Sequence, residues 1–299
     1  MSTRESFLEP AVLARVENYH LLARTVVEGF VAGLHRSLFH GFGSEFVQYR
    51  HYSRGDDLKY VDWKVYARLD RLQTKVFQEE TNTNCYIVLD CSASMGYARN
   101  PATPTKLQYG KLIAACLAYL VNRQGDNVGF FAYADDLRCA LRPSHRPGQV
   151  QHIFAQLEQQ AASGACQHQR VLQFLGEHFR RRGLVVLISD LLDTDEALYR
   201  ALRLFRCAHH DCVVFHVLDA DETEFPFTGT VRFVDSEGGG DLVTAPAVVR
   251  ERYLKAFAAY LDRTEHFART HELDYHRLLT NQPLEVALTA FLHRREVFR

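Results

Sequence analysis

Short, uninterrupted apolar runs alternate with helical patterns through the middle of this 299-residue chain, and this alternation limits the fold more than any other feature. Runs such as CYIVLD and LVVLIS read as strands buried on both faces, which occur where helices cover both sides of a parallel sheet. We therefore expect an α/β fold with a doubly wound, mostly parallel sheet. The predicted strands are 85–90, 127–134, 184–189 and 212–218, and the predicted helices are 106–123, 149–160, 171–182 and 195–208.

One stretch in the middle of the chain and the two ends of the chain depart from this alternation. Asp135-Asp136 lead into 137–142, which predicts an antiparallel hairpin at one edge of the sheet. Apolar residues at three- and four-residue steps predict a helix over 8–36. We expect 1–80 to be an N-terminal helical and bracing segment, and 81–299 to be the sheet domain with a C-terminal extension. That extension is predicted to hold a hairpin at 231–235 and 241–245, a helix at 250–271, a strand at 274–279 and a helix at 284–293.

Composition narrows the class of protein. The 35 basic and 36 acidic residues nearly balance, so no global charge excess points to nucleic acid. The seven cysteines include no C-x-x-C pair, and several lie in apolar runs, which is typical of a reducing compartment. No apolar run reaches the ~18 residues of a membrane span, and MSTRESFLEP lacks the apolar centre of a signal peptide. We expect a cytoplasmic protein with no membrane insertion.

An aspartate and two serines at alternate positions follow the first strand. Asp90, Ser92 and Ser94 place oxygen donors just beyond a strand end, a set that suits Mg²⁺ better than zinc or copper. The simpler alternative is a serine-rich turn that caps the next helix. The strand 184–189 also ends in an acid, Asp190. If the sheet order is 3-2-1-4-5, the two strands are neighbours where the winding reverses, and ligands bind there. A shared cation would explain why two acids face each other.

The D-x-S-x-S sequence, with an acid after the fourth strand, resembles the metal-ion-dependent adhesion site of von Willebrand factor A domains. The upstream stretch is similar to the signature of a bacterial family catalogued as domain of unknown function number fifty-eight. The resemblance runs from about Gly33 to Asp190 and carries little information after residue 220. The matching motifs are GSEF (43–46), YRHY (49–52), RGDD (54–57), VDWK (61–64) and AR (67–68).

The resemblance implies a Rossmann-like A-domain fold and association with MoxR-type AAA+ ATPases. It also implies that Asp90, Ser92, Ser94 and Asp190 hold Mg²⁺ or another divalent cation. Well-characterised A domains place a threonine in a second loop, where this chain reads ASGAC (162–166). Ser163 or a water molecule would have to fill that position, or the site is weak or empty.

Two classes of function stay open. The first is a non-enzymatic interaction module that works with a MoxR-type ATPase to assemble or remodel client proteins. In this module a partner carboxylate completes the coordination of the metal. The alternative is a serine hydrolase of the α/β type that uses Ser94, with a base such as His216 or His276, because 92–96 partly imitates a nucleophile elbow. Against this alternative, Ser92 stands where that strained turn prefers glycine. The chain has no P-loop or Rossmann glycine fingerprint, so we predict no nucleotide cofactor and no catalytic residue.

Charged and aromatic residues crowd the stretch from Glu45 to Arg68. Aromatic rings interleaved with cations suggest a surface for single-stranded nucleic acid. The acids and bases nearly alternate, however, so we favour internal ion pairs and expect no nucleic-acid partner. We expect this stretch to brace the N-terminal helix against the sheet, with Trp63 packed in the core. Trp63→Ala would then cost ~3–5 kcal/mol of stability.

Overall fold

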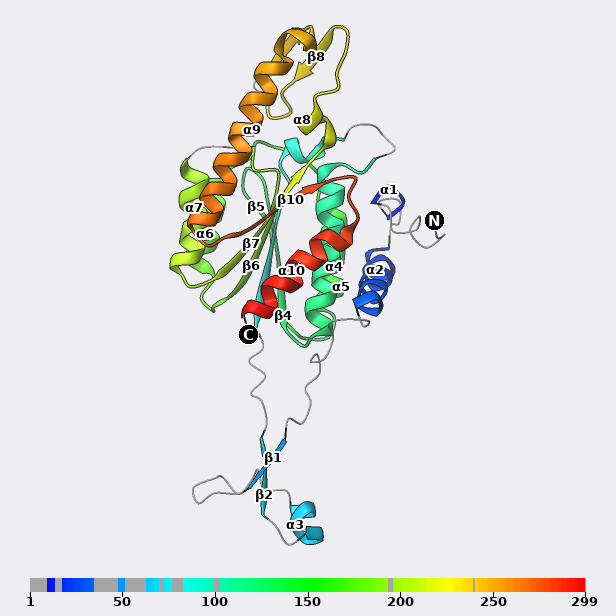
Figure 1. Cartoon of the computed structure of the whole chain (residues 1–299), viewed down its shortest axis with the longest axis vertical. Helices are drawn as coiled ribbons and strands as arrows, with labels where there is room; N and C mark the ends of the chain where they lie inside the picture. Colours follow the sequence, from blue (N-terminus) through cyan, green and yellow to red (C-terminus); the bar gives the residue numbers. More distant parts are fainter. Residues whose placement is uncertain are drawn as a thin grey trace. The chain divides into compact units, whose positions relative to one another are not determined.

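The chain forms two compact units, one of residues 1–34 with 83–299 and one of residues 35–82 (Figure 1). The division differs from the predicted boundary at residue 80, because the N-terminal helix α2 (Tyr19–Leu34) packs on α4 (Lys106–Arg123) and belongs with the sheet. The apolar stripe of α2, which includes Leu22 and Val26, is buried in this contact layer. The computed structural model describes residues 10–13, 18–34, 48–51, 63–69, 72–76, 83–98, 103–192, 196–238 and 240–298.

A six-stranded sheet forms the centre of the larger unit, in the order β10-β7-β6-β3-β4-β5. Neighbouring strands run parallel except for β5, which pairs antiparallel with β4. When the six strands of this sheet are renumbered 1 to 6 along the chain, their order from β5 to β10 is 3-2-1-4-5-6. The predicted doubly wound α/β sheet with an antiparallel edge hairpin is therefore confirmed, with β10 added beyond the fifth strand. The strands are β3 (Asn84–Asp90), β4 (Asn127–Tyr133), β5 (Leu137–Ser144), β6 (Gly183–Ser189), β7 (Asp211–Leu218) and β10 (Asp274–Leu279).

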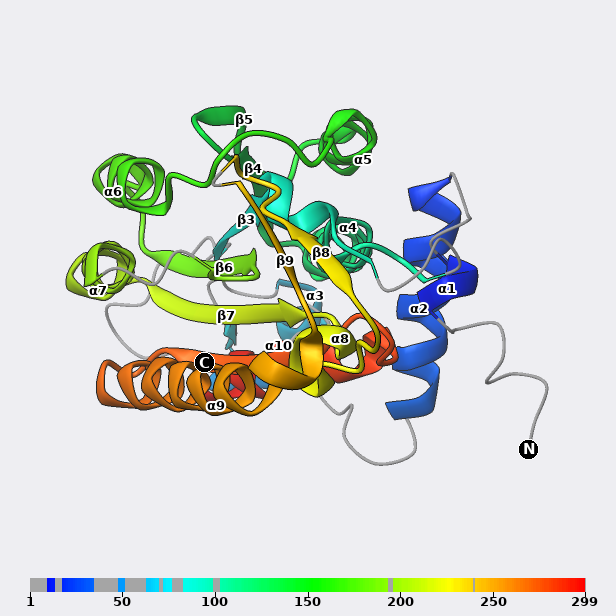
Figure 2. The ribbon, with the colours of Figure 1, turned by 90° about the horizontal axis from the view of Figure 1, so that it is seen from above.

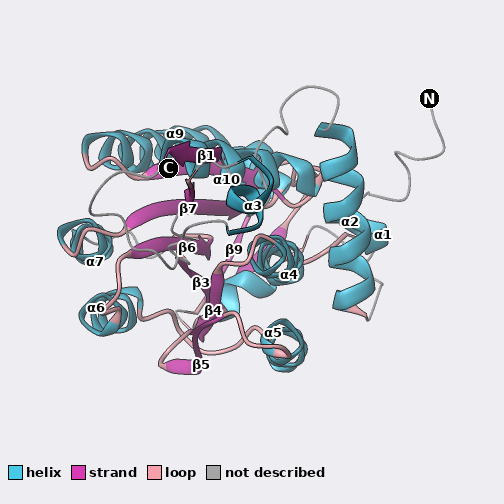
Figure 3. Ribbon diagram, turned by 90° about the horizontal axis from the view of Figure 1, so that it is seen from below, coloured by secondary structure: helices cyan, strands magenta, loops and turns pink. Residues whose placement is uncertain are grey.

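Helices cover both faces of this sheet (Figures 2 and 3). On one face α4 packs against the central strands, with α5 (Gln149–Gln159) and α10 (Leu284–Phe298) beside it. On the other face lie α6 (His168–His178) and α7 (Glu196–Cys207). Every residue of β3, β6 and β7 is buried, because helices close both faces of these strands.

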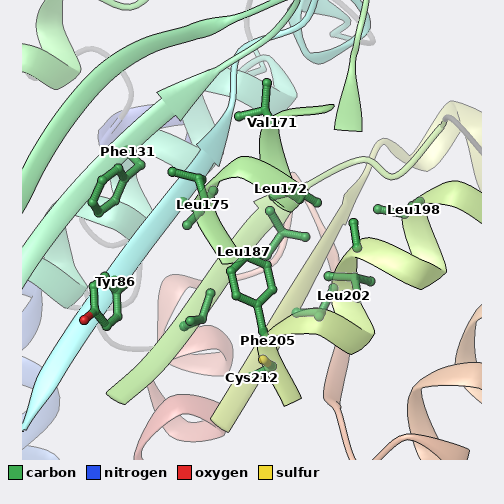
Figure 4. Close-up of a cluster of buried hydrophobic side chains, with 14 of the residues drawn as sticks. Tyr86, Phe131, Val171, Leu172, Leu175, Leu187, Leu198, Leu202, Phe205 and Cys212 are labelled. Carbon is green, nitrogen blue, oxygen red and sulfur yellow. The ribbon is translucent and has the colours of Figure 1, made fainter. Parts of the chain in front are cut away.

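The core beneath α6 and α7 is a cluster of buried aliphatic and aromatic side chains (Figure 4). Tyr86 stacks on Phe179 with ring centroids 4.0 Å apart, and Phe205 of α7 is fully buried. The Tyr86 hydroxyl donates to the carbonyl of Arg181 at 2.8 Å, so this polar group is not left unpaired in the core. Burying one large apolar side chain contributes about 1.5–3 kcal/mol, so the cluster fixes α6 and α7 firmly to the sheet.

The helix α4 approaches the sheet closely and has a lysine at its N-terminus. Thr105 closes a capping box that fixes where this helix begins. At Gly110 an added Cβ would lie 3.0 Å from the Leu89 side chain and 3.2 Å from that of Ile188, so glycine permits the close packing. Lys106, the first residue of the helix, is thereby brought beside the end of β6, where it contacts the acid that follows this strand.

The C-terminal extension follows β7. A short helix, α8 (Ala220–Glu224), leads into an antiparallel hairpin of β8 (Val231–Val234) and β9 (Asp241–Thr244), as predicted. Figure 2 shows this hairpin crossing above the carboxyl ends of the sheet strands. The long helix α9 (Pro246–Thr270) begins earlier than the predicted residue 250, because Pro246 is suited to the first turn of a helix.

The smaller unit is described in β1 (Gln48–His51), α3 (Trp63–Leu69) and β2 (Gln73–Val76), with β1 and β2 paired antiparallel. The side chain of Trp63 is 56% exposed and packs edge-on against Tyr66. The prediction that Trp63 lies in the core is therefore wrong, because a seven-residue helix offers too little apolar surface to enclose an indole. Residues 52–62 lie outside the described residues, so the ion pairs expected there stay a prediction.

The predicted helix over 8–36 is described as α1 (Pro10–Leu13) and α2, and residues 14–17 between them lie outside the described residues. None of the described helices combines the length and the apolar character needed to cross a membrane.

Candidate functional site

Two acidic residues stand at the ends of neighbouring strands. β3 and β6 pair in parallel up to Leu89 and Ile188, so Asp90, the last residue of β3, lies beside Ser189, and Asp190 follows one residue beyond the end of β6 at the same carboxyl edge of the sheet. Both are buried, with 0% and 1% of their surface exposed. Buried carboxylates lose hydration and repel each other, so each requires compensating partners. The two acids have very different partners.

Asp90 is held by uncharged donors. Its Oδ1 accepts the backbone N–H of Ser92 at 2.9 Å, and its Oδ2 accepts the Ser189 hydroxyl at 2.7 Å. The hydroxyls of Ser92 and Ser94 bond to each other at 3.0 Å, at the start of a 3₁₀ helix, η3 (Ala93–Gly96). Burial raises the pKa of Asp90 and nearby Asp190 raises it further, while the imidazole of His168 and the hydrogen bonds from Ser189 and Ser92 oppose the rise.

Asp190 instead has a buried cation beside it. The Nζ atom of Lys106 lies 2.7 Å from Oδ2 of Asp190 and 2.7 Å from Oε1 of Glu222, and the Lys106 side chain is 1% exposed. Burial by itself would raise the pKa of Asp190, but the Lys106 ammonium overrides burial and holds this pKa below its usual value. Burial by itself would lower the pKa of Lys106, but the two neighbouring acids raise this pKa above its ordinary value. Lys106 therefore stays protonated and bridges the two carboxylates.

Glu222 is fixed by the start of α8. Its Oε2 accepts the backbone N–H of Asp219 at 2.7 Å, which completes a capping box at the end of β7. The Thr280 hydroxyl in turn donates to Asp219 at 3.2 Å. The carboxylate of Glu222 is thus positioned by backbone geometry, and Lys106 binds a preformed pair of acids.

The backbone around Asp190 is also constrained. His216 of β7 donates from Nε2 to the Asp190 carbonyl at 2.8 Å, and its Nδ1 accepts the Tyr275 hydroxyl at 2.6 Å. Burial lowers the pKa of His216 to about 4, so the ring is neutral at pH 7. The next residue, Leu191, has a φ of 49°, a left-handed conformation that costs on the order of 1–2 kcal/mol for a residue with a Cβ. Such strain is concentrated at functional sites.

The second loop, residues 161–167, is tied to the D-x-S-x-S loop by backbone hydrogen bonds. Ala93 donates to the carbonyl of Gly164 at 2.9 Å, and Ser163 donates to that of Cys91 at 3.1 Å. Arg138 of β5 reinforces this contact by donating to the carbonyl of Ser163 at 2.7 Å. Ser163 is exposed, so its side chain does not take the place of the missing threonine.

Cys166 and His168 are the side chains near the second loop that reach Asp90. The Sγ atom of Cys166 lies 3.7 Å from Oδ2 of Asp90, and Nε2 of His168 lies 3.8 Å from the same oxygen. Both residues are buried. The half of the site around Asp90 therefore contains a thiol and an imidazole, whereas the half around Asp190 contains an ammonium.

These residues fit the implied Mg²⁺ only in part. The structure brings Asp90, Ser92 and Ser94 together and places Asp190 on the adjacent strand, so hard oxygen donors are present. The ammonium of Lys106 already compensates Asp190, however, and these carboxylates and hydroxyls are 0–7% exposed. As arranged, the site offers no open coordination position to a partner's carboxylate.

The geometry gives no support to a serine hydrolase. The hydroxyl of Ser94 pairs with that of Ser92, and His216 is engaged by Tyr275 and the backbone of Asp190. Within the described residues no histidine is hydrogen bonded to Ser94, so the pair of nucleophile and base that the reaction needs is not assembled.

Sequence reasoning missed Lys106, Glu222, Cys166 and His168. Lys106 gave a weak signal as a charged residue at the start of an otherwise apolar helix. Glu222 gave one because it lies three residues after Asp219, the acid that follows β7. Cys166 gave a signal only as the last residue of ASGAC, the loop without threonine. These roles depend on contacts between residues 76 to 116 positions apart, which local pattern does not reveal.

The strand order and the D-x-S-x-S loop at the end of the first strand define an α/β protein with a von Willebrand factor A-like fold. The chain belongs to the family described as "Protein of unknown function DUF58", whose family model matches residues 48–262. The family membership predicted from the motifs is therefore confirmed.

Similar proteins were found among both sequences and solved structures. An uncharacterized protein of Mycobacterium tuberculosis is 28% identical over 258 residues, covering 84% of this chain and 80% of that protein. The conserved hypothetical protein BatB of Bacteroides thetaiotaomicron matches 71% of this chain and 98% of its own, with 17% identity and a TM-score of 0.48. The SpRpn10 VWA domain matches 70% of this chain and 94% of its own, with 10% identity and a TM-score of 0.39. No function follows for this chain from these likenesses.

Proposed function

We propose that this chain is a non-enzymatic protein-interaction module that binds its partner at the carboxyl edge of the sheet. The observation that carries this proposal is the form of that edge: a buried and largely self-compensated polar cluster beneath exposed loops. A catalytic site would present a reactive group to solvent, whereas here the solvent-facing residues at the edge include Tyr97, Leu192 and residues 163–165 of the second loop. Exposed aromatic and aliphatic side chains on a rigid edge are suited to protein contacts.

The proposed partner is a MoxR-type AAA+ ATPase, acting with this chain on client proteins in the cytoplasm. The support for this partner is the resemblance of the motifs between residues 43 and 190 to those of the family. The rigid cluster suits a module of this kind, because it would hold the edge loops in one conformation for docking.

The test is capture of the MoxR-type ATPase of the same organism by the full chain. Tyr97→Ala and Leu192→Ala each remove an exposed side chain at the edge, 38% and 44% exposed in the structure. We expect each to weaken the measured affinity roughly tenfold, as loss of an interface anchor does. Phe174→Ala is the matched control, because Phe174 is 44% exposed on α6, outside the edge loops. Equal affinity for all four proteins would show that the partner binds elsewhere, and no capture by wild type would remove the ATPase from the proposal.

Magnesium dependence is a separate proposal with its own test. Its support is the set of hard oxygen donors on Asp90, Ser92, Ser94 and Asp190. Because Lys106 already compensates Asp190, we expect weak Mg²⁺ binding by the chelated wild-type protein and tighter binding by Lys106→Met. Calorimetric titration measures both, with Asp90→Ala as the variant that abolishes binding. If none of the three proteins binds Mg²⁺, the magnesium proposal fails and the interaction proposal is unaffected.

A further inference from the structure

One buried histidine in this site has a ring nitrogen that makes no hydrogen bond. His168 is 0% exposed, and within the described residues its Nε2 forms no hydrogen bond. Its other ring nitrogen, Nδ1, lies 2.8 Å from the hydroxyl of Tyr133. When Nδ1–H donates to this hydroxyl, Nε2 carries a lone pair directed toward Asp90. In this tautomer the buried lone pair has no hydrogen-bond donor, which costs free energy, and a bound metal ion would remove this cost.

Two further ligand atoms surround the same point. Oδ2 of Asp90 lies 3.7 Å from Sγ of Cys166 and 3.8 Å from Nε2 of His168, and all three atoms are within 4.8 Å of one another. A tetrahedral zinc ion with ligands at about 2.0–2.3 Å holds those ligands roughly 3.3–3.8 Å apart. The two separations from Asp90, 3.7 and 3.8 Å, are close to this spacing, and the third is within 4.8 Å, so a small movement of the side chains would enclose a metal.

We propose that Asp90, Cys166 and His168 form a binding site for Zn²⁺ or a transition metal of similar ligand preference. Thiolate and imidazole ligands select such metals over Mg²⁺, which takes oxygen ligands. Binding displaces the thiol proton of Cys166 and leaves one tetrahedral position for a water molecule. Tyr133 plays the part that a hydrogen-bond partner plays behind a metal-bound histidine, since it holds the ring in place and its hydroxyl can accept Nδ1–H when Nε2 binds the metal.

The charges in the site also favour this position. Asp190 has the ammonium of Lys106 beside it at 2.7 Å, whereas Asp90 is hydrogen bonded by hydroxyl and backbone donors that carry no charge. The imidazole of His168, 3.8 Å from Asp90, is the one basic side chain that the described residues bring this close to Asp90, and a metal cation bound between them would supply a fixed positive charge. It would also join the end of β3 to the segment from Cys166 to His168 and so fix the second loop. This inference goes beyond the proposed function, because it concerns another class of metal and a structural role.

The test is titration of the chelated, reduced full chain with Co²⁺, whose bond to a thiolate gives a charge-transfer absorption band. We expect one equivalent to bind with this band and a tetrahedral visible spectrum, and Zn²⁺ to displace it. Cys166→Ser should lose the charge-transfer band, and His168→Ala should bind at least tenfold more weakly. Cys85→Ser is the matched control and should keep the band, because Cys85 is buried at the opposite end of β3 from Asp90.

Circular dichroism spectra check that each variant is folded, and a variant that does not fold is replaced by Cys166→Ala or His168→Gln. Absence of the band in wild type, or its persistence in the folded Cys166 variant, would overturn the zinc site. Excess Mg²⁺ that displaces Co²⁺ would also overturn it, because it would assign the position to oxygen ligands. The proposed function has a different readout, capture of the ATPase, so the two can fail separately.

Discussion

Asp90 ends one strand and Asp190 follows the end of its neighbour, yet the two carboxylates have opposite electrostatic surroundings. Asp190 is compensated by the ammonium of Lys106, which holds its pKa down, so it is charged in the folded protein. Asp90 is surrounded by hydroxyl, thiol and imidazole groups, and burial raises its pKa. One half of the site therefore contains a buried ammonium in direct contact with its acid, whereas the other half contains only the imidazole of His168, 3.8 Å from its acid.

The difference shows that an acid at a strand end does not by itself define a metal site. In a buried site the neighbouring charges decide whether a carboxylate needs a metal. Lys106 of α4 compensates the charge of Asp190 without a metal ion, and it shares its single positive charge between Asp190 and Glu222. Replacing the buried cation, or either carboxylate, should therefore affect the two halves differently.

The largest expected effect follows from removal of the buried ammonium. Lys106→Met keeps the apolar length of the side chain but leaves Asp190 and Glu222 without a counter-charge. Breaking a buried ion pair in this way destabilises a protein by about 3–5 kcal/mol. Urea unfolding of the chelated protein at pH 7 measures the loss of unfolding free energy.

Lys111→Met is the matched control for this experiment. Lys111 is a second buried lysine of α4, but its Nζ donates to the carbonyl of Gln160, and burial lowers its pKa. Its loss should cost about 1–3 kcal/mol, the range for leaving one buried polar group unpaired. If both variants lose the same free energy, the ion pair at Asp190 is no stronger than an ordinary buried hydrogen bond, and the contrast between the two halves fails.

A smaller effect of opposite sign is expected when each acid is replaced by its amide. The folded-state pKa of Asp190 is lowered, so its ionisation stabilises the protein above the unfolded pKa of about 3.9, and this stability is lost as the pH falls through the folded value. The folded-state pKa of Asp90 is raised, so its ionisation destabilises the folded protein as the pH rises above about 3.9.

Over about pH 2 to 8, the stability of Asp190→Asn relative to wild type should therefore fall up to about pH 4 and then stay level, whereas that of Asp90→Asn should stay level up to about pH 4 and rise above it. Every tenfold difference in proton affinity between the folded and unfolded states corresponds to about 1.4 kcal/mol. Thermal and urea unfolding of chelated proteins over this pH range provides the two slopes. Parallel slopes for the two variants would mean that the acids share one environment.

The smallest effect is expected outside the site and provides a baseline. Trp63 is 56% exposed, so Trp63→Ala should change the unfolding free energy by about 0.5 kcal/mol or less. The measurement is the same urea titration at pH 7. A loss above about 3 kcal/mol would restore the core position that the sequence suggested, since that is the cost of truncating a buried tryptophan.

The central sheet could be predicted from sequence because each strand carries its own evidence. Continuous apolar runs such as 184–189 must be buried on both faces, and the helices between them require parallel connections. The rule that ligand sites form where the winding reverses then led to Asp90 and Asp190. The prediction that Trp63 lies in the core was wrong because local sequence indicates a helix there but not whether other residues pack over the indole.

The sequence by itself determined the strands and the acid that comes at or after the end of two of them, because hydrophobic period follows from local pattern, whereas the order 3-2-1-4-5 was assumed and the structure confirms it. The tertiary structure alone decided the chemistry of those acids. Lys106 lies 84 positions from Asp190 and 116 from Glu222, and Cys166 lies 76 positions from Asp90. Charge and hydrogen bonding act through space over a few ångströms, so the state of a buried group depends on which distant segments pack against it.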